Sequence, residues 1–276
     1  MTKAKKFPAG DTKMQNAVTY EVVYLDTVKA RDLRYGLITF RNPAHFWSEA
    51  KFPWGTMIEE HRFNFHTVSA LSAILDQVEA DLSLAGIIIT GEGKYFSNGV
   101  DVEFVRSHLG SASTLQKQLE LVMARVLSLG VVTVAVLNGH TTAAGAIFSL
   151  CCDYRIMSER GLFLLPAVAL GIVYSQGFIE VVKHRVLDPS LLRDILLWSK
   201  RYSSSQLLDL RLIDRVLSGD AAMEEAISLI RKNLQEHSAS LAEAKRRLYR
   251  SAIVALSDER VSEMHWDRLV APRSKL

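Results

Sequence analysis

Two glycine-containing loops carry the residues whose types and spacing best suit chemistry. The first, Gly91 to Asp101 (GEGKYFSNGVD), follows the apolar run Leu84 to Thr90, which is typical of a buried parallel strand, and leads into a helix predicted over 102 to 109. The second, His140 to Gly145 (HTTAAG), follows the similar apolar run Val131 to Leu137. A polar loop between a buried strand and a helix aims backbone N–H groups at one point, which favours an anionic or polarised oxygen. One such loop alone is equally compatible with a tight turn that binds nothing.

Both loops place small residues at the turn. These are Ser97, Asn98 and Gly99 in the first loop and Ala143, Ala144 and Gly145 in the second, so the backbone can approach a ligand closely. Two such turns on neighbouring strands can each donate one N–H to the same oxygen. Donors of this kind form an oxyanion hole, and removing one typically slows a reaction by on the order of 100-fold or more. The pair of loops therefore predicts stabilisation of developing negative charge on an oxygen.

The surrounding pattern predicts strands and helices first and helices alone afterwards. Thr19 to Asp26 and Tyr35 to Arg41 are predicted to form an opening hairpin, because β-branched and aromatic residues cluster there. Tyr154 to Ser158 is a further predicted strand, and Phe163 to Ala169 a strand or extended loop. Helices are predicted from apolar spacing over His61–Ala80, Ser113–Leu129, the stretch from Ala146 to Cys152, Gly177–Val186, Pro189–Trp198, Ser204–Leu210, Ala221–Glu236, Ser240–Leu256 and Ser257–Leu269. Asp188 and Ser203 to Ser205 are N-cap signals.

The predicted helix Ser113–Leu129 has one apolar face. Its apolar residues recur at helical spacing, so they are expected to face the core. They are Leu115, Leu119, Leu121, Val122, Val126 and Leu127.

Composition and charge narrow the class of protein. The 276 residues are 49% hydrophobic, which is enough for a full core in one large domain or two small ones. With 33 basic and 30 acidic residues the net charge is +3, so neither nucleic acid nor an anionic membrane is required as a partner. The adjacent Cys151 and Cys152 cannot easily bridge each other, which favours a reducing compartment. No apolar run approaches the roughly 20 residues needed to cross a bilayer.

The pattern also suggests boundaries along the chain. Residues 1–16 are polar and lysine-rich and are expected to be flexible. A strand-and-helix core is predicted over 17–200 and a helical region over 201–273. The last three residues, Ser274, Lys275 and Leu276, spell SKL, which a receptor reads as a peroxisomal import address. The expected location is therefore the peroxisome or a related organelle such as the glycosome, with the import receptor as a partner.

Taken together, the motifs resemble the enoyl-CoA hydratase/isomerase, or crotonase, family. FSNGVD (Phe96 to Asp101) is similar to that family's F-S/A-x-G-x-D, and NGHTTAAGAIFSLCCDYRI (Asn138 to Ile156) to its N-G-x-x-x-G-G-G ahead of a helix ending in C-D. Trp198 to Ser218 resembles the family's helix-turn before L-x-D-x-V, and the likeness covers roughly Tyr35 to Ser251. It implies an α/β spiral of ββα units, trimers or hexamers formed through the C-terminal helical region, and an acyl-CoA thioester substrate, with coenzyme A as part of the substrate and no further cofactor or metal.

By position, the resemblance assigns the oxyanion hole to the N–H groups of Val100 and Ala144. It also implies a set of residues that line the substrate. These are Asn64 and Phe65 near the adenine side, and Ser97, Asn98, Gly99, Val100, Asp101 and Gly145 near the thioester. For Asp101 we favour a helix N-cap over a catalytic role. Ala143 and Ala144 stand where the family has glycines, so each N–H survives but the added methyl groups narrow the approach.

The catalytic base is where the sequence departs from the family. An enolate held in the hole requires an acid/base at the α-carbon, and the family supplies it as a glutamate at one or both of two places, occupied here by Ile147 and Ala167. A single glutamate with an apolar residue at the first place resembles the peroxisomal 3,2-enoyl-CoA isomerases, so Ile147 disfavours a hydratase. Ala167 removes the isomerase's base as well. Glu180 is a candidate replacement, and the others considered are His66, Glu103, His140, Tyr174 and Ser175.

Three functions therefore remain open. The favoured one is isomerisation of 3-enoyl-CoA to 2-enoyl-CoA in fatty-acid β-oxidation, with Ala167 in place of the usual glutamate. The alternatives are a catalytically inactive acyl-CoA-binding paralogue and a thioester hydrolase or decarboxylase that uses only the oxyanion hole. The aromatic-rich stretch 44–60 is expected either to cover the acyl or adenine end or to form a surface or trimer-contact insertion.

Overall fold

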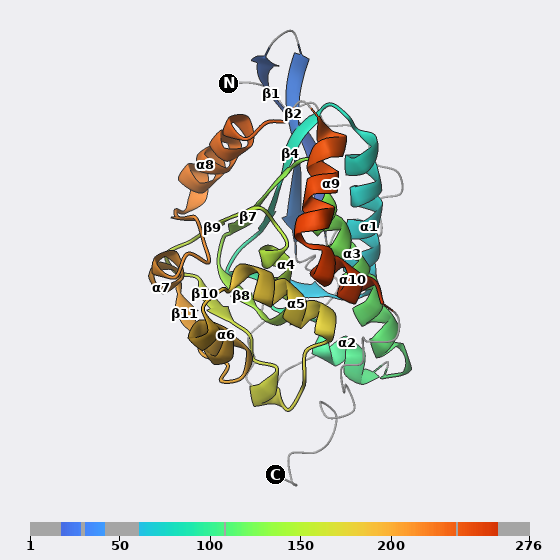
Figure 1. The fold of residues 1–276 in the computed structure, drawn as a ribbon, viewed down its shortest axis with the longest axis vertical. Helices are drawn as coiled ribbons and strands as arrows, with labels where there is room; N and C mark the ends of the chain where they lie inside the picture. Colours follow the sequence, from blue (N-terminus) through green and yellow to red (C-terminus); the bar gives the residue numbers. More distant parts are fainter. Residues whose placement is uncertain (1–17, 29–30, 42–60, 108, 236, 259–276) are drawn as a thin grey trace.

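A six-stranded, mostly parallel sheet forms the centre of the fold (Figure 1). The computed structural model describes residues 18–28, 31–41, 61–107, 109–235 and 237–258. The sheet has the order β1-β2-β4-β7-β9-β12, with bounds β1 Val18–Val28, β2 Arg31–Phe40, β4 Leu84–Gly91, β7 Val132–Leu137, β9 Tyr154–Met157 and β12 Arg215–Val216. β1 and β2 pair antiparallel, which confirms the predicted hairpin, and each later pair in the sheet is parallel.

Shorter strands form two smaller sheets beside the first. One has the order β11-β10-β8-β5, from β11 Tyr202–Ser203, β10 Leu162–Leu164, β8 His140–Thr142 and β5 Tyr95–Ser97. The other pairs β3 Arg62–Phe63 with β6 Gly99–Val100. A long strand, one or two short strands and a helix thus recur along the chain, and this confirms the predicted ββα spiral.

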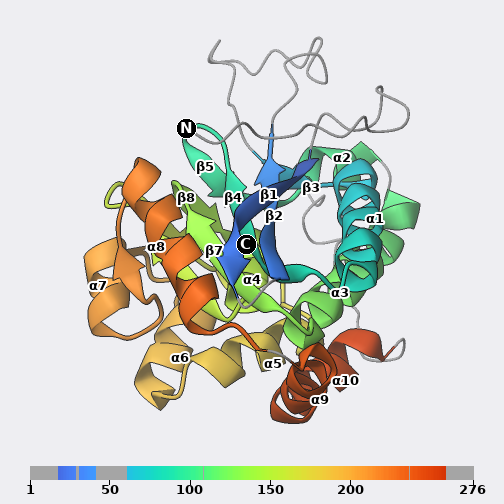
Figure 2. The same ribbon diagram turned by 90° about the horizontal axis from the view of Figure 1, so that it is seen from above.

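Helices cover both faces of the central sheet (Figure 2). Their bounds are α1 Phe65–Ala80, α2 Val102–Ser107, α3 Ala112–Ser128, α4 Ala143–Leu150, α5 Gln176–Arg185, α6 Pro189–Leu196, α7 Ser204–Asp209, α8 Gly219–Lys232, α9 Ser238–Leu248 and α10 Arg250–Ser257, with 3-10 turns η1 Leu109–Ser111 and η2 Val168–Leu170. α8 packs on one face, while α1, α3 and α10 lie beyond the other. No helix among the described residues is both long and apolar enough to span a bilayer.

The core explains why the buried strands have no alternating pattern. Ile88 packs in the cluster beneath α8, whereas Ile87 and Ile89 point into the larger cluster on the opposite face, and all three are fully buried. A parallel strand covered on both faces needs apolar residues at every position. The continuous run at 84–90 is therefore a direct consequence of the fold's layered architecture.

Several sequence-based expectations need correction. The predicted helix Ser240–Leu256 is two helices, α9 and α10, joined at Tyr249. The region after Ser175 is not wholly helical, because it contains β11 and β12. Parts of both predicted loops are short strands, since two or three residues are too few for a detectable period. Leu121 of α3, expected in the core, is 43% exposed.

Other expectations are confirmed or lie outside the described residues. Asp188 caps α6, and Ser203 caps α7 with Gln206 completing a capping box. The predictions for residues 1–16, 44–60 and 274–276, and the predicted helix Ser257–Leu269 beyond residue 258, lie outside the described ranges.

Candidate active site

Ser97 organises the first loop. Its buried hydroxyl donates to the His61 carbonyl oxygen at 3.0 Å and accepts from the Gly99 N–H at 3.1 Å. The Asn98 N–H donates to the same His61 carbonyl oxygen at 2.8 Å. A Cβ added to Gly145 in the second loop would lie 2.6 Å from Ser97 Cβ. The serine therefore ties the first loop to His61, directly before β3, and lies against the second loop, which requires glycine at 145.

Asp101 closes the first loop as a helix cap. Its N–H donates to the Phe63 carbonyl oxygen at 2.9 Å, and its Oδ1 accepts from the Phe104 N–H at 3.1 Å. The same Oδ1 lies 3.6 Å from Arg62 Nη1. These contacts confirm the N-cap role expected for Asp101. The amides at 98, 99 and 101 all bind acceptors, and Val100 lies between them in β6.

The second loop enters α4 through a strained residue. Ala143 has φ +51°, in the left-handed region that costs an L-residue roughly 1–2 kcal/mol. The N-cap residue Thr142 makes no side-chain capping bond. The N–H groups of a first helical turn have no intrahelical acceptor and carry the positive end of the helix dipole. The Ala144 N–H belongs to this turn, so the strained residue presents a donor at the loop.

The two loops meet directly. Thr142 Oγ1 donates to Asn98 Oδ1 at 3.0 Å. Gly99 has φ +81°, and a Cβ added there would lie 2.7 Å from the Ala144 backbone nitrogen. Such an approach is possible only for glycine. The residues predicted to supply the hole are therefore brought together by backbone packing.

Asn64 and Phe65 lie beside this junction, where β3 turns into α1. Asn64 is the N-cap of α1, and its Oδ1 accepts from the Thr67 N–H at 3.0 Å. Phe65 packs edge-on against Phe104, with ring centroids 5.6 Å apart. Both residues thus have structural partners, and the structure holds them next to the strand that pairs with β6.

The two positions to which the resemblance assigns the family's glutamates are apolar and buried. Ile147 is fully buried in α4, and Ala167 is 3% exposed. Glu180, the candidate replacement, is bound on α5, with its Oε1 2.7 Å from Lys183 Nζ and 2.8 Å from Gln176 Nε2. Burial acts to raise the pKa of Glu180, but the hydrogen bond and charge of Lys183 outweigh it and hold that pKa below its usual value. A carboxylate paired in this way is a poor base.

Three of the remaining candidates for the base, His66, Glu103 and His140, differ in exposure and in their partners. His66 is exposed, and Glu103 forms an exposed ion pair with Arg106 at 2.8 Å. The His140 ring packs at a tilt against Tyr95 with ring centroids 5.3 Å apart, and burial, aided by the charge of Lys94, lowers the pKa of His140.

Tyr174 and Ser175 lie on the buried side of the segment that follows Ala167. The Tyr174 hydroxyl lies near the Ala167 amide without hydrogen-bond geometry and has no partner among the described residues. Burial raises the pKa of Tyr174 well above its usual value. Ser175 Oγ lies 2.5 Å from Oε1 of Glu120, a fully buried residue that the apolar pattern of its helix did not single out.

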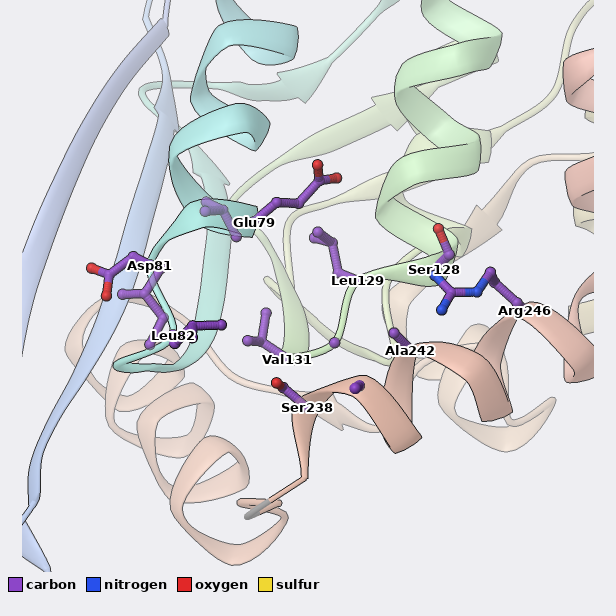
Figure 3. Close-up of a pocket in the computed structure, with 13 residues that line it drawn as sticks. Glu79, Asp81, Leu82, Ser128, Leu129, Val131, Ser238, Ala242 and Arg246 are labelled. Carbon is purple, nitrogen blue, oxygen red and sulfur yellow. The ribbon is translucent and has the colours of Figure 1, made fainter.

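A separate surface pocket lies away from both loops (Figure 3). It has a volume of about 320 Å³ and lies between the ends of α1 and α3 and the start of α9. Its lining includes Glu79, Leu82, Ser128 and Arg246 and none of the residues predicted for the oxyanion hole. Within the described part of the chain, no group of three or more His, Cys, Asp or Glu residues could hold a metal ion.

Comparisons with known proteins agree with this geometry. Residues 61–268 match the family described as enoyl-CoA hydratase/isomerase. Enoyl-CoA delta isomerase 3 of Arabidopsis thaliana is 30% identical over 62% of this chain and 75% of its own length. Peroxisomal enoyl-CoA delta isomerase 2 of the same plant is 32% identical over 56% and 68%. A putative enoyl-CoA hydratase of Thermus thermophilus is 30% identical over 68% and 73%.

Solved structures show the same fold at lower identity. An enoyl-CoA isomerase of Mycobacterium tuberculosis superposes with a TM-score of 0.71 at 20% identity, covering 88% of this chain and 95% of its own. An enoyl-CoA hydratase/isomerase family protein of Pseudomonas syringae gives 0.71 at 21% identity, covering 88% and 96%. The converging loops, the ββα spiral and the family match over most of the chain lead to one assignment: this protein belongs to the enoyl-CoA hydratase/isomerase, or crotonase, family of enzymes.

Proposed function

We propose that the chain binds an acyl-CoA thioester with its carbonyl oxygen between the N–H groups of Val100 and Ala144 and isomerises 3-enoyl-CoA to 2-enoyl-CoA. The observation that carries this proposal is the approach of the two loops, where a Cβ on Gly99 would lie 2.7 Å from the Ala144 nitrogen. The amides around Val100 already donate to His61, Phe63 or Ser97. The Ala144 amide lies in the first turn of α4, where an external acceptor is favoured.

The chemistry follows from where charge develops. Loss of a proton from C2 of a 3-enoyl-CoA gives a dienolate whose negative charge rests largely on the thioester oxygen. Two fixed N–H donors stabilise this charge more strongly than the neutral carbonyl of the substrate, which is the condition for catalysis. Return of the proton to C4 moves the double bond to C2–C3.

Isomerisation is favoured over hydration for two reasons. Ile147 occupies the first of the family's two carboxylate positions, and hydration requires both. The Arabidopsis relatives are named enoyl-CoA delta isomerases, although a Thermus relative at similar identity is named a putative hydratase. Ala167 in the second position is part of the proposal, since it requires that the base comes from elsewhere.

Wild type and Ala167→Glu, each supplied with a 3-enoyl-CoA, test the proposal. Formation of the conjugated 2-enoyl thioester is followed by its absorbance, and release of free coenzyme A by a thiol reagent. Val168→Glu is the matched control, because it adds the same charge one residue further along at a side chain that is 47% exposed.

Turnover by wild type supports the isomerase. Activity in Ala167→Glu alone would instead identify a catalytically inactive acyl-CoA-binding protein, and release of coenzyme A without isomerisation would identify a hydrolase. If Val168→Glu gained as much activity as Ala167→Glu, position 167 would have no special relation to the substrate.

We also propose a peroxisomal location and a trimeric or hexameric assembly. The C-terminal Ser274, Lys275 and Leu276, together with the peroxisomal name of an Arabidopsis relative, support the location. The measurements are the distribution of a fluorescent fusion with and without the last three residues, and the mass in solution by light scattering. A fusion that is equally cytosolic in both forms, or a monomeric mass, would contradict the respective proposal.

A further inference from the structure

On α3 a charged residue is buried while the apolar residue next to it is exposed. Glu120 is fully buried, whereas its neighbour Leu121 is 43% exposed. Neighbouring residues of an α-helix point about 100° apart, so the orientation of α3 that buries the glutamate turns the leucine outward. Taking a carboxylate out of water is costly unless the protein provides fixed partners for it, and ionisable groups retained at such cost gather at functional sites.

Glu120 is held by partners from two elements. Its Oε1 accepts from Gln116 Nε2, one turn earlier on α3, at 3.0 Å. It also accepts from Ser175 Oγ at 2.5 Å, across a separation of 55 residues. Ser175 is the N-cap of α5 and accepts from the Phe178 N–H at 3.3 Å. The carboxyl group is therefore fixed where α3 meets the start of α5.

This meeting point adjoins the position where the family's glutamate is missing. Ser175 directly follows Tyr174, whose hydroxyl lies near the Ala167 amide. Tyr174 is 7% exposed, and its hydroxyl has no hydrogen-bond partner among the described residues. The segment thus has the apolar Ala167 at one end and, at the other, Ser175, which binds the carboxyl group of Glu120.

α5 connects this segment to the oxyanion hole. α5 begins directly after Ser175 and packs against α4, whose first turn contains the Ala144 N–H. α10 packs against both α3 and α5 (Figure 1). Glu120 on α3 is thus linked through Ser175 to α5, the helix that packs against α4, and it lies on a different element than either family position, 147 or 167.

We propose that Glu120 is the acid/base of the reaction and that Ser175 positions its carboxylate; this rests on the isomerase function proposed above. The carboxylate takes a proton from C2 of the 3-enoyl-CoA, and the C–H electron pair forms a dienolate held by the N–H groups of Val100 and Ala144. The protonated carboxyl then returns the proton to C4, the carbonyl re-forms, and the C2–C3 double bond is made. Glu120 ends as a carboxylate, so the step balances without an oxidant or reductant.

A purely structural role predicts a different outcome, and Glu120→Gln separates the two. Glutamine keeps an oxygen that accepts from Ser175 and Gln116, so a contact that only anchors α5 would survive, but the amide cannot take up the proton. We expect kcat for 3-enoyl-CoA to fall by about 100-fold or more, since general acid–base catalysis contributes roughly 10²- to 10⁴-fold. KM is expected to stay within a few fold and the melting temperature near that of wild type. Glu79→Gln on α1, a residue 47% exposed at its side chain, is the control expected to keep full activity.

Ser175 provides an independent measurement if Glu120→Gln does not fold. Ser175→Ala removes the donor to Glu120 and is expected to lower kcat by about tenfold without a matching rise in KM, whereas Ser175→Thr keeps a hydroxyl and restores most of the rate. Equal kcat values for the two Ser175 variants would overturn the proposal.

The outcomes distinguish this inference from the proposed function. Active wild type with a folded Glu120→Gln that retains its rate would overturn the role of Glu120 and leave the isomerase standing. Retention in Glu120→Gln with loss in Glu180→Gln would transfer the role to Glu180. Wild type without isomerase activity would refute the proposed function, and the inference with it.

Discussion

The left-handed backbone at Ala143 leads to a quantitative prediction for Ala143→Gly. Ala143 has φ +51°, at the turn where the second loop enters α4. An L-residue pays roughly 1–2 kcal/mol for this conformation and glycine does not. Glycine also makes the unfolded chain more flexible, which costs roughly 0.4–1 kcal/mol. The net expectation is a stabilisation of about 0.5–1 kcal/mol, or a rise in melting temperature of about 1–3 °C.

Arg211→Gly is the matched control for this substitution. Arg211 has φ +58° after α7, and its side chain is exposed. Relief of strain predicts a similar rise in melting temperature for both variants. Only Ala143→Gly is expected to change acyl-CoA affinity, because the Ala143 Cβ lies 2.9 Å from where a Cβ on Gly99 would be and so narrows the approach between the loops.

Thermal unfolding by circular dichroism and acyl-CoA titration by calorimetry measure the two effects separately. A lower melting temperature for Ala143→Gly beside a higher one for Arg211→Gly would refute the reasoning, since it would mean that the methyl group's packing outweighs the strain. Equal changes of affinity in both variants would refute the assignment of this turn to the substrate.

Three further predictions concern the same loops, the C-terminal helices and the thiols. Gly99→Ala is expected to lower the free energy of unfolding by more than the roughly 1–2 kcal/mol of backbone strain and to abolish acyl-CoA binding, because its Cβ would lie 2.7 Å from the Ala144 nitrogen. Gly219→Ala is the control: Gly219 has φ +58° and a Cβ there would meet nothing within 4 Å, so denaturation and calorimetry should show the strain alone. Lys245→Met removes the cation 2.6 Å from Asp153 Oδ2, and breaking a buried pair costs about 3–5 kcal/mol; an unchanged urea midpoint would show that the pair does not hold α9 to the sheet. Burial raises the pKa of Cys152 from 9.0 to about 12, so iodoacetamide should label this thiol at pH 8 only after unfolding. The free energy of unfolding should fall as the pH rises from about 9 towards 12, because in that range the thiol ionises in the unfolded chain but not in the folded one.

The elements that were predicted well are those in which every residue lies in the same environment, such as strands that are buried on both faces. β4 and β7 are buried on both faces, and so their apolar runs identify them without structural information. The strands of two or three residues that build the second sheet carry no period, and their pairing is set by tertiary contacts such as β5 with β8. The break between α9 and α10 at Tyr249 has no proline or glycine to mark it.

In the candidate site, too, some residues could be predicted from the sequence and others could not. The loops were identified from Gly99 and Gly145, which are needed because backbone atoms approach within the space of a Cβ. Glu120 was missed because its position on α3 depends on the exact phase of the helix. Leu119 is fully buried and Leu121 is 43% exposed, and the apolar spacing alone does not show on which side of Leu119 the buried face extends. A glutamate inside a run of apolar residues is the signal that was available.

This division has a consequence for how the family's chemistry is inherited. An oxyanion hole of the kind proposed above would depend on the path of the backbone rather than on side chains, and structures of 20–21% identity with TM-scores of 0.71 share this fold. A catalytic carboxyl group is a side chain, and any element that lines the substrate can supply it. The buried apolar residues at 147 and 167 therefore argue against a base at either family position, and they have no bearing on the proposed main-chain donors. A buried carboxyl group on a third element, α3, is the arrangement that would let such a chain keep the reaction while losing the motif.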